Sequence, residues 1–261
     1  MTEKGKIYLV TKADDLGSNH SANRAFWDAF QKGVLRNGVI MMTCDGAKEA
    51  AELFRDQRDF CMGLHLTMNA EWDHIKWEPV LPAEKVPSLV TEEGYFFRTT
   101  KELHDNRPKM DEMMAEIQAQ LDLARQYGLN IRFADCHMGF SRVIDGLDRE
   151  IQNWCDRNGL IYKHGPIPRL PMVESEGTPI TRLLNRLKAT DPGVYYIHMG
   201  HPAYDTPEMR ALGHFGYPGD AVAEEREWDR RAMMDPEVVN YFHRNQIIPV
   251  TMEEALGRIN R

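Results

Sequence analysis

Cysteine is scarce in this sequence, with four residues among 261. Cys44, Cys61, Cys136 and Cys155 each lie in an apolar or strand-like context, and no two of them have Cys-x-x-Cys spacing. This scarcity argues against a disulfide framework and against a metal site built from cysteine ligands. We therefore expect reduced thiols and a cytoplasmic location.

The sequence also lacks a long apolar run and an excess of positive charge. No window is long and apolar enough to span a bilayer. The short apolar run at residues 7–13 stops at two acids and is typical of a first strand rather than a signal peptide. Lys and Arg number 32 against 40 Asp and Glu, which gives a net charge of −8. This balance argues against nucleic acid and anionic membrane surfaces as main partners.

A further absence concerns cofactor motifs, because no Gly-x-Gly-x-x-Gly follows the first apolar run. What is present is a strict alternation of apolar and amphipathic runs. The seven apolar runs lie at residues 7–13, 38–44, 60–68, 131–137, 160–165, 194–200 and 247–251. Such alternation predicts an α/β fold with parallel strands and helices outside. A barrel and an open doubly wound sheet both fit, and we favour a barrel-like (β/α) arrangement of about seven strands.

Capping residues mark several expected helix starts. Ser18 or Asn19 is available to cap the first helix, and Asp45 is most simply the N-cap of the helix after it. A further start is expected at residues 235–236 (DP). Residues 251–254 (TMEE) fit a capping box for the last helix.

One segment, residues 70–107, interrupts the alternation. It contains three prolines, two tryptophans and the run Tyr95-Phe96-Phe97. Connections of this length tend to be functional. Two interpretations are open: a small β-hairpin that packs its aromatic side chains against the barrel, or a wall of the binding cleft. We expect a single domain over residues 1–261 with this segment inserted.

Polar side chains collect at the expected carboxyl ends of the strands, where parallel α/β folds bind their ligands. They are Asp14 and Asp15 at the first strand, His65 at the third, Asp135 and His137 at the fourth, and His198 and His201 at the sixth. Nitrogen and oxygen ligands suit a divalent cation such as zinc, manganese, iron or magnesium. The pattern therefore predicts a metal site at this edge.

A structural explanation competes with the metal site for each residue taken alone. A single histidine at a strand end is more often a hydrogen-bonded structural residue than a ligand. Either Asp14 or Asp15 could cap the helix that begins near Ser18. The metal site is favoured because four of the seven strand ends carry such groups.

Four short motifs in order give the chain a family resemblance. They are Ala13-Asp14-Asp15-Leu16-Gly17, Gly63-Leu64-His65-Leu66, Asp135-Cys136-His137 and His201-Pro202. This succession resembles the YdjC-like carbohydrate deacetylases over most of the chain. The resemblance implies a distorted (β/α) barrel like that of polysaccharide deacetylases. It also implies a divalent metal that helps to remove acetyl groups from N-acetylated sugars.

Carried over motif by motif, the resemblance implies roles for five residues. Asp15, His65 and His137 look like the metal ligands. Asp14 looks like the catalytic base that takes a proton from the attacking water, and His201 like the acid that protonates the leaving amine. The implied metal is magnesium or zinc, with manganese or iron as alternatives.

The resemblance leaves several points open. Asp135, two residues before His137, is expected to orient a ligand or the acid, and a loop-anchoring hydrogen bond is the alternative. The family pattern usually continues with further histidines, but here Met138-Gly139-Phe140-Ser141 follows. The substrate expected is a small N-acetylated mono- or oligosaccharide, and the chain is compatible with a homodimer. The rival functions are hydrolysis of another amide or of a phosphoester, and a catalytically silent sugar-binding protein.

The adjacent acids impose a geometric condition. In a regular strand, Asp14 and Asp15 point to opposite faces. Both can serve one metal site only if the strand breaks at about Asp15, and Gly17 is the residue that lets the chain turn.

Overall fold

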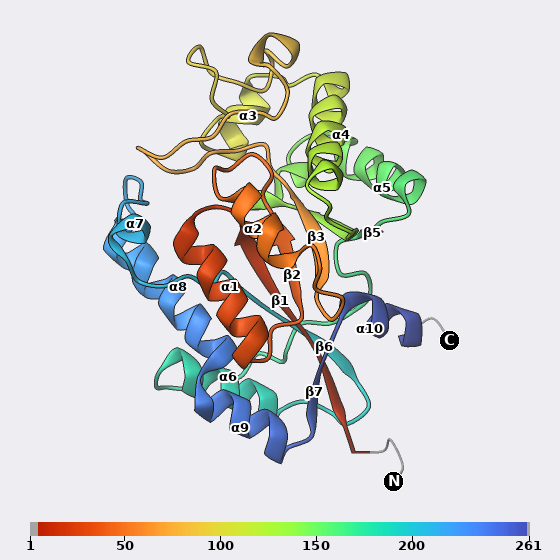
Figure 1. The fold of residues 1–261 in the computed structure, drawn as a ribbon, viewed down its shortest axis with the longest axis vertical. Helices are drawn as coiled ribbons and strands as arrows, with labels where there is room; N and C mark the ends of the chain where they lie inside the picture. The colour runs from red at the N-terminus through yellow and green to blue at the C-terminus, as the bar shows by residue number, and fades with distance from the viewer. Residues whose placement is uncertain (1–4, 260–261) are drawn as a thin grey trace.

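The computed structural model describes residues 5–259, and seven parallel strands form its centre (Figure 1). They are β1 (Ile7–Leu16), β2 (Asn37–Ile40), β3 (Cys61–Leu66), β4 (Ile131–Cys136), β5 (Ile161–Tyr162), β6 (Tyr195–Gly200) and β7 (Ile247–Val250). Their order is β5-β4-β3-β2-β1-β6, with β7 also paired to β1.

The sheet curls into an incomplete barrel. Strands that follow one another in sequence are neighbours from β1 to β5, and β6 returns to the free edge of β1. Between β5 and β6 the ring is joined by one parallel bridge, from Arg169 to Ile197. β7 and β2 share one edge of β1, where Asn37 donates to the carbonyls of Thr11 and Val250 at 3.0 and 2.9 Å. The distorted barrel of parallel strands expected from the sequence is confirmed.

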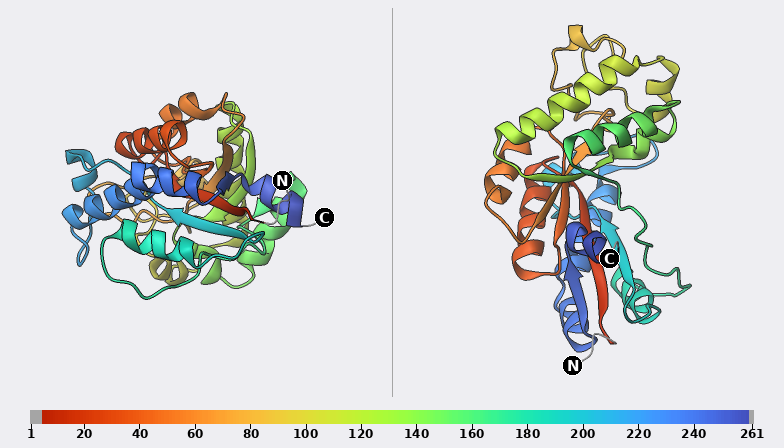
Figure 2. Two further views of the ribbon diagram at one scale, coloured as in Figure 1. Left: turned by 90° about the horizontal axis from the view of Figure 1, so that it is seen from below. Right: turned by 90° about the vertical axis from the view of Figure 1, so that its right-hand side faces the viewer.

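Helices surround the sheet, as the two further views in Figure 2 show. The longer ones are α1 (His20–Lys32), α2 (Ala47–Phe54), α4 (Met110–Gln126), α5 (Leu147–Asn158), α6 (Pro179–Lys188), α8 (Gly219–Met234), α9 (Pro236–Arg244) and α10 (Met252–Ile259). Shorter turns are η1 (Ala83–Lys85), α3 (Thr100–Asp105), η2 (His137–Arg142) and α7 (Pro207–Arg210). Among residues 5–259, no helix has the length and hydropathy needed to cross a membrane.

The helix caps agree with the sequence except at one position. Asn19 accepts from the amide of Ala22 at 2.8 Å, Asp235 caps α9, and residues 251–254 form the expected capping box. The assignment of Asp45 as an N-cap was wrong. The turn before α2 uses a backbone acceptor, the carbonyl of Cys44, which binds the amide of Ala47 at 3.0 Å. Gly46 precedes the helix, and Asp45 is exposed.

The segment 70–107 lies at the end of the molecule away from the two termini (Figure 1). A β-hairpin was one expectation for this segment. Within these fully described residues, the structure has only one antiparallel bridge, between Val90 and Phe96. Its aromatic side chains Trp72, Trp77 and Phe96 are nevertheless buried against the core. The segment thus packs its aromatic residues inward without forming a regular ladder.

Buried carboxylates of α4 anchor this segment. Glu116 is fully buried and accepts from the amides of Val80 at 2.9 Å and Leu81 at 3.0 Å. We expect Glu116→Ala to lower the free energy of unfolding by about 2 to 4 kcal/mol, since two backbone donors lose their acceptor. Urea unfolding measures this. Asp111→Ala, an exposed acid on the same helix, is the control and should change stability by about 0.5 kcal/mol or less. A Glu116→Ala effect no larger than the control would contradict the anchoring role.

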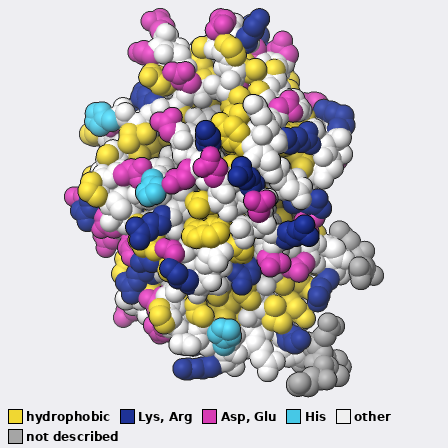
Figure 3. Space-filling model, in the orientation of Figure 1, with side chains coloured by type: hydrophobic (Ala, Val, Ile, Leu, Met, Phe, Trp, Pro, Cys, Tyr) yellow, Lys and Arg dark blue, Asp and Glu magenta, His cyan; other side chains and the backbone are white. Residues whose placement is uncertain are grey.

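On the face drawn in Figure 3, acidic and basic side chains are interspersed. This face therefore carries no basic patch, which agrees with the net charge of −8.

Candidate active site

The end of β1 bends at the predicted residue. Asp15 has φ +74° and Gly17 has φ +88°, and the register between β1 and β2 shifts between Ala13 and Leu16. An aspartate tolerates this left-handed conformation better than most residues. Asn23 of α1 holds the bend, because its Oδ1 accepts from the amide of Gly17 at 2.8 Å. The side chain of Asp15 therefore does not point to the face that the regular alternation of a strand would give it.

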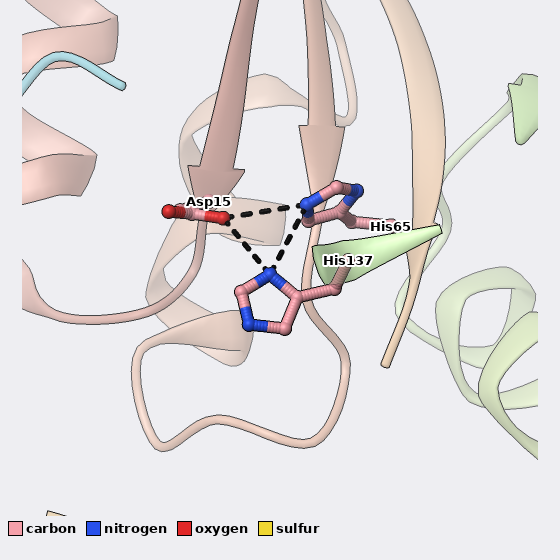
Figure 4. Close-up of side chains that lie close together, drawn as sticks. All are labelled: Asp15, His65 and His137. Carbon is pink, nitrogen blue, oxygen red and sulfur yellow. Dashed lines mark hydrogen bonds and ion pairs between the residues drawn. The ribbon is translucent and has the colours of Figure 1, made fainter. Parts of the chain in front are cut away.

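Three ligand-type side chains meet at the carboxyl ends of the strands (Figure 4). Asp15 Oδ1 lies 3.3 Å from His65 Nε2 and 3.4 Å from His137 Nδ1, and the two ring nitrogens are 3.4 Å apart. The residues come from β1, β3 and the turn η2 directly after β4. A point equidistant from three such atoms in their plane is about 2 Å from each, which is the bond length of zinc to nitrogen or oxygen.

Carboxylates fix the orientation of both imidazoles. Asp135 Oδ1 lies 2.6 Å from His65 Nδ1, and Glu71 Oε2 lies 2.9 Å from His137 Nε2. Since a carboxylate accepts, each of these nitrogens is the protonated one, and in a neutral ring the lone pair of the other nitrogen faces Asp15. Asp15 Oδ1 itself is buried without a hydrogen bond from the described residues. Two lone pairs and a carboxylate oxygen that face one another are the environment that a cation requires.

The charges of the site lead to the same requirement. Its four carboxylates are Asp14, Asp15, Asp135 and Glu71, its two fixed cations are Lys12 and Arg226, and each side chain is 18% exposed or less. Two positive and four negative charges leave a net charge of −2. A buried uncompensated charge is costly, so one dication balances this cluster.

Without a cation, protons take its place. Burial by itself would lower the pKa of both imidazoles, but the neighbouring carboxylates have the larger combined effect. Asp135 and Asp15 raise the pKa of His65 to about 9, and Glu71 and Asp15 raise the pKa of His137 to about 10. A dication that binds at neutral pH must therefore displace these protons.

Glu71 offers a test of this arrangement. We expect Glu71→Gln to weaken metal binding about 10- to 100-fold, because the amide supplies a weaker acceptor to His137 Nε2. Competition with a chromophoric chelator measures the change. Glu78→Gln, an exposed acid of the same segment, is the control. Unchanged affinity in Glu71→Gln would show that His137 needs no carboxylate partner.

Lys12 lies under the site and is only 2% exposed. Its Nζ contacts Asp14 Oδ1 at 2.5 Å and also forms an ion pair with Asp135 Oδ2. Burial would lower the pKa of this ammonium, but Asp135 and Asp14 raise it above its ordinary value. Lys12 is therefore charged at neutral pH.

Asp14 and His201 line one narrow pocket together with Asp15. Asp14 uses Oδ1 for Lys12, and its Oδ2 has no hydrogen-bond partner among residues 5–259. Asp229 of α8 accepts from the backbone amide of His201 at 2.7 Å and lies 3.7 Å from His201 Nδ1. Gly200 allows this approach, because a Cβ there would lie 3.0 Å from Asp229 Cγ.

The inserted segment supplies part of the pocket. Glu71, Trp72 and Trp77 line it beside the carboxylates, and Met41, Met209 and Leu212 add apolar surface. The wall interpretation of residues 70–107 therefore agrees with the pocket lining, whereas of the hairpin interpretation only the inward packing of the aromatic side chains is present.

Other candidates lie outside the three-residue cluster. His198 is on β6 opposite Thr11, and burial lowers its pKa to about 4. Where the family usually has further histidines, Met138 is 43% exposed and Phe140 is buried in the core. Phe140 therefore brings no polar group to the cleft.

Sequence reasoning missed Glu71, Asp229 and Arg226, and it also missed the pairing of Lys12 with Asp14 and Asp135. A signal existed for Lys12, because residues two apart on a strand share a face and Lys12 stands two before Asp14. Asp229 lies 28 residues beyond His201 on a helix, and no spacing rule joins them.

Comparison with known proteins shows which family this chain resembles. Residues 8–163 match the YdjC-like protein family. A carbohydrate deacetylase of Thermoanaerobacter pseudethanolicus is 26% identical over 258 residues, which cover 92% of this chain and 96% of that protein. One from Brevibacillus brevis is 29% identical over 259 residues, covering 94% and 98%.

Solved structures share the fold. A protein of Enterococcus faecalis, named for cellobiose-phosphate cleavage, superposes with a TM-score of 0.70 at 20% identity over 95% of this chain and 98% of its own. The Bc1960 peptidoglycan N-acetylglucosamine deacetylase gives a TM-score of 0.53 at 11% identity over 97% and 89%. The family match spans more than half of the chain, and this protein therefore belongs to the YdjC-like family.

Proposed function

We propose that this protein is a metal-dependent hydrolase that removes the acetyl group from an N-acetylated sugar. The observation that carries the proposal is the convergence of Asp15, His65 and His137 on one point beside a carboxylate, Asp14, that is not a member of that cluster. Full-length relatives named carbohydrate deacetylases support the choice of substrate.

The ligand spacing favours zinc among the candidate metals. Atoms bound tetrahedrally at 2.0–2.1 Å are about 3.3 to 3.4 Å apart, whereas neighbouring ligands of octahedral magnesium are about 3.0 Å apart. The observed separations are 3.3, 3.4 and 3.4 Å. Two imidazoles also suit zinc better than magnesium, whose preferred ligands are oxygens.

A bound divalent metal polarises the amide carbonyl and lowers the pKa of water, which makes both reactants more reactive. The chain supplies the proton transfers. Asp14 Oδ2 takes a proton from the attacking water, and His201 donates a proton to the nitrogen of the leaving amine. Asp229 holds His201 through its backbone amide and faces Nδ1 of the ring, so the acid stays directed at the pocket.

The rival functions receive less support from the same contacts. A phosphoesterase needs basic groups to hold phosphate, but Lys12 is already paired with Asp14 and Asp135. A silent sugar-binding protein has no need of the complete set of Asp14, Asp15, His65, His137 and His201.

The test is acetate release from N-acetylglucosamine and its oligomers by protein loaded in turn with zinc, magnesium, manganese or iron. We expect release that a chelator stops and that zinc restores best. Hydrolysis of p-nitrophenyl phosphate, assayed in parallel, should stay at background. Phosphatase activity without acetate release would reverse the assignment, and sugar binding with no turnover under any metal would support the silent protein.

A further inference from the structure

Lys12 joins two parts of the site that are distant in sequence. Its Nζ contacts Asp14 on β1 and Asp135 on β4, and the other oxygen of Asp135 lies 2.6 Å from His65 Nδ1. A continuous series of contacts therefore runs from Asp14 through Lys12 and Asp135 to the metal-ligand candidate His65.

Burial of the Lys12 ammonium is energetically costly unless the charge is paired. Among residues 5–259, Lys12 is the only lysine that is buried. A neutral side chain of similar volume would fill the same space but would leave Asp14 Oδ1 and Asp135 Oδ2 without the cation that both contact. Breaking such a buried pair is more damaging than the pair is stabilising.

We propose that Lys12 is a positioning residue that fixes both carboxylates at once. It holds Asp14 by Oδ1, so that Oδ2 is the oxygen left for the reacting water. It holds Asp135 by Oδ2, so that Oδ1 is the oxygen that orients His65. The first half of this role rests on the proposed function, whereas the second half concerns only metal binding.

The kinetic test is a double-mutant cycle with Lys12→Met and Asp14→Asn. We expect Lys12→Met to lower kcat about 10- to 100-fold with KM changed by less than about threefold, because geometry at the base and not substrate binding is disturbed. In the Asp14→Asn background the same change should cost less than about threefold, because the group it positions has been removed. Lys101→Met, an exposed lysine paired with Asp105, is the matched control.

Metal affinity, measured by chelator competition, tests the second half without any turnover. Lys12→Met and Asp135→Asn should each weaken zinc binding by about tenfold. The double variant Lys12→Met/Asp135→Asn should bind zinc no more weakly than whichever of the two single variants binds it less tightly. This arm remains decisive if no sugar is a substrate, so failure of the proposed function and failure of the inference are distinguishable.

Folding is the remaining control. If Lys12→Met does not fold, the change is made together with Asp14→Asn or with Asp135→Asn, so that one of the two acids that lose their cation is neutral. Each double variant is then compared with the single variant Asp14→Asn or Asp135→Asn that it contains. The proposal is overturned if Lys12→Met leaves kcat and zinc affinity unchanged, or if its effects multiply fully with those of Asp14→Asn and Asp135→Asn.

Discussion

Asp14→Asn is expected to lower kcat for acetate release by about 10²- to 10⁴-fold while the protein keeps one equivalent of metal. Activity falls because an amide cannot take a proton from the attacking water. The metal is retained because Asp14 does not belong to the cluster of Asp15, His65 and His137. Steady-state kinetics and metal analysis on the same preparation give both numbers.

The matched control for Asp14→Asn is Asp45→Asn. Asp45 is an exposed acid that follows the next strand, and it is not a member of the cluster of Asp15, His65 and His137. It should retain wild-type kcat. Wild-type turnover in Asp14→Asn would remove the base from the mechanism. Loss of the metal together with the activity would make Asp14 a ligand instead.

The second large effect is expected from the ligand candidates. Asp15→Ala and His137→Ala should each abolish metal binding at micromolar concentration and lower activity by at least about 10³-fold, because two remaining donors hold a dication weakly. The melting temperature gives an independent measure. A metal at 100 times its Kd stabilises the wild-type protein by about 2.7 kcal/mol, and this gain should vanish in both variants.

His20→Ala serves as the control for these variants, because its side chain is 68% exposed and lies on the surface of α1. It should bind metal and melt like the wild type. If Asp15→Ala or His137→Ala took up a full equivalent of metal, the assignment of the cluster as the metal site would fail.

The sequence was sufficient to place the site at one rim because the carboxyl ends of all strands of a parallel barrel meet there. Strand ends alone grouped Asp15, His65 and His137 with four other polar residues, and the family resemblance then singled out these three as ligands. The bend at Asp15 followed from the same reasoning, since two adjacent residues of a regular strand cannot face one site.

The partners of these residues could not be predicted in the same way. Glu71 reaches His137 from an irregular segment, and Asp229 reaches His201 from the middle of α8, so their positions depend on long-range packing. Asp45 failed as a cap for a related reason. Capping propensity is a local rule, and the backbone carbonyl of Cys44 had already satisfied the first donor of the turn.

The most direct measurement is anomalous diffraction at the zinc edge from a crystal of the zinc-loaded protein. We predict one strong peak about 2 Å from Asp15 Oδ1, His65 Nε2 and His137 Nδ1, with Asp14 outside bonding distance. A peak elsewhere in the molecule, or none at this position under saturating zinc, would contradict the central claim.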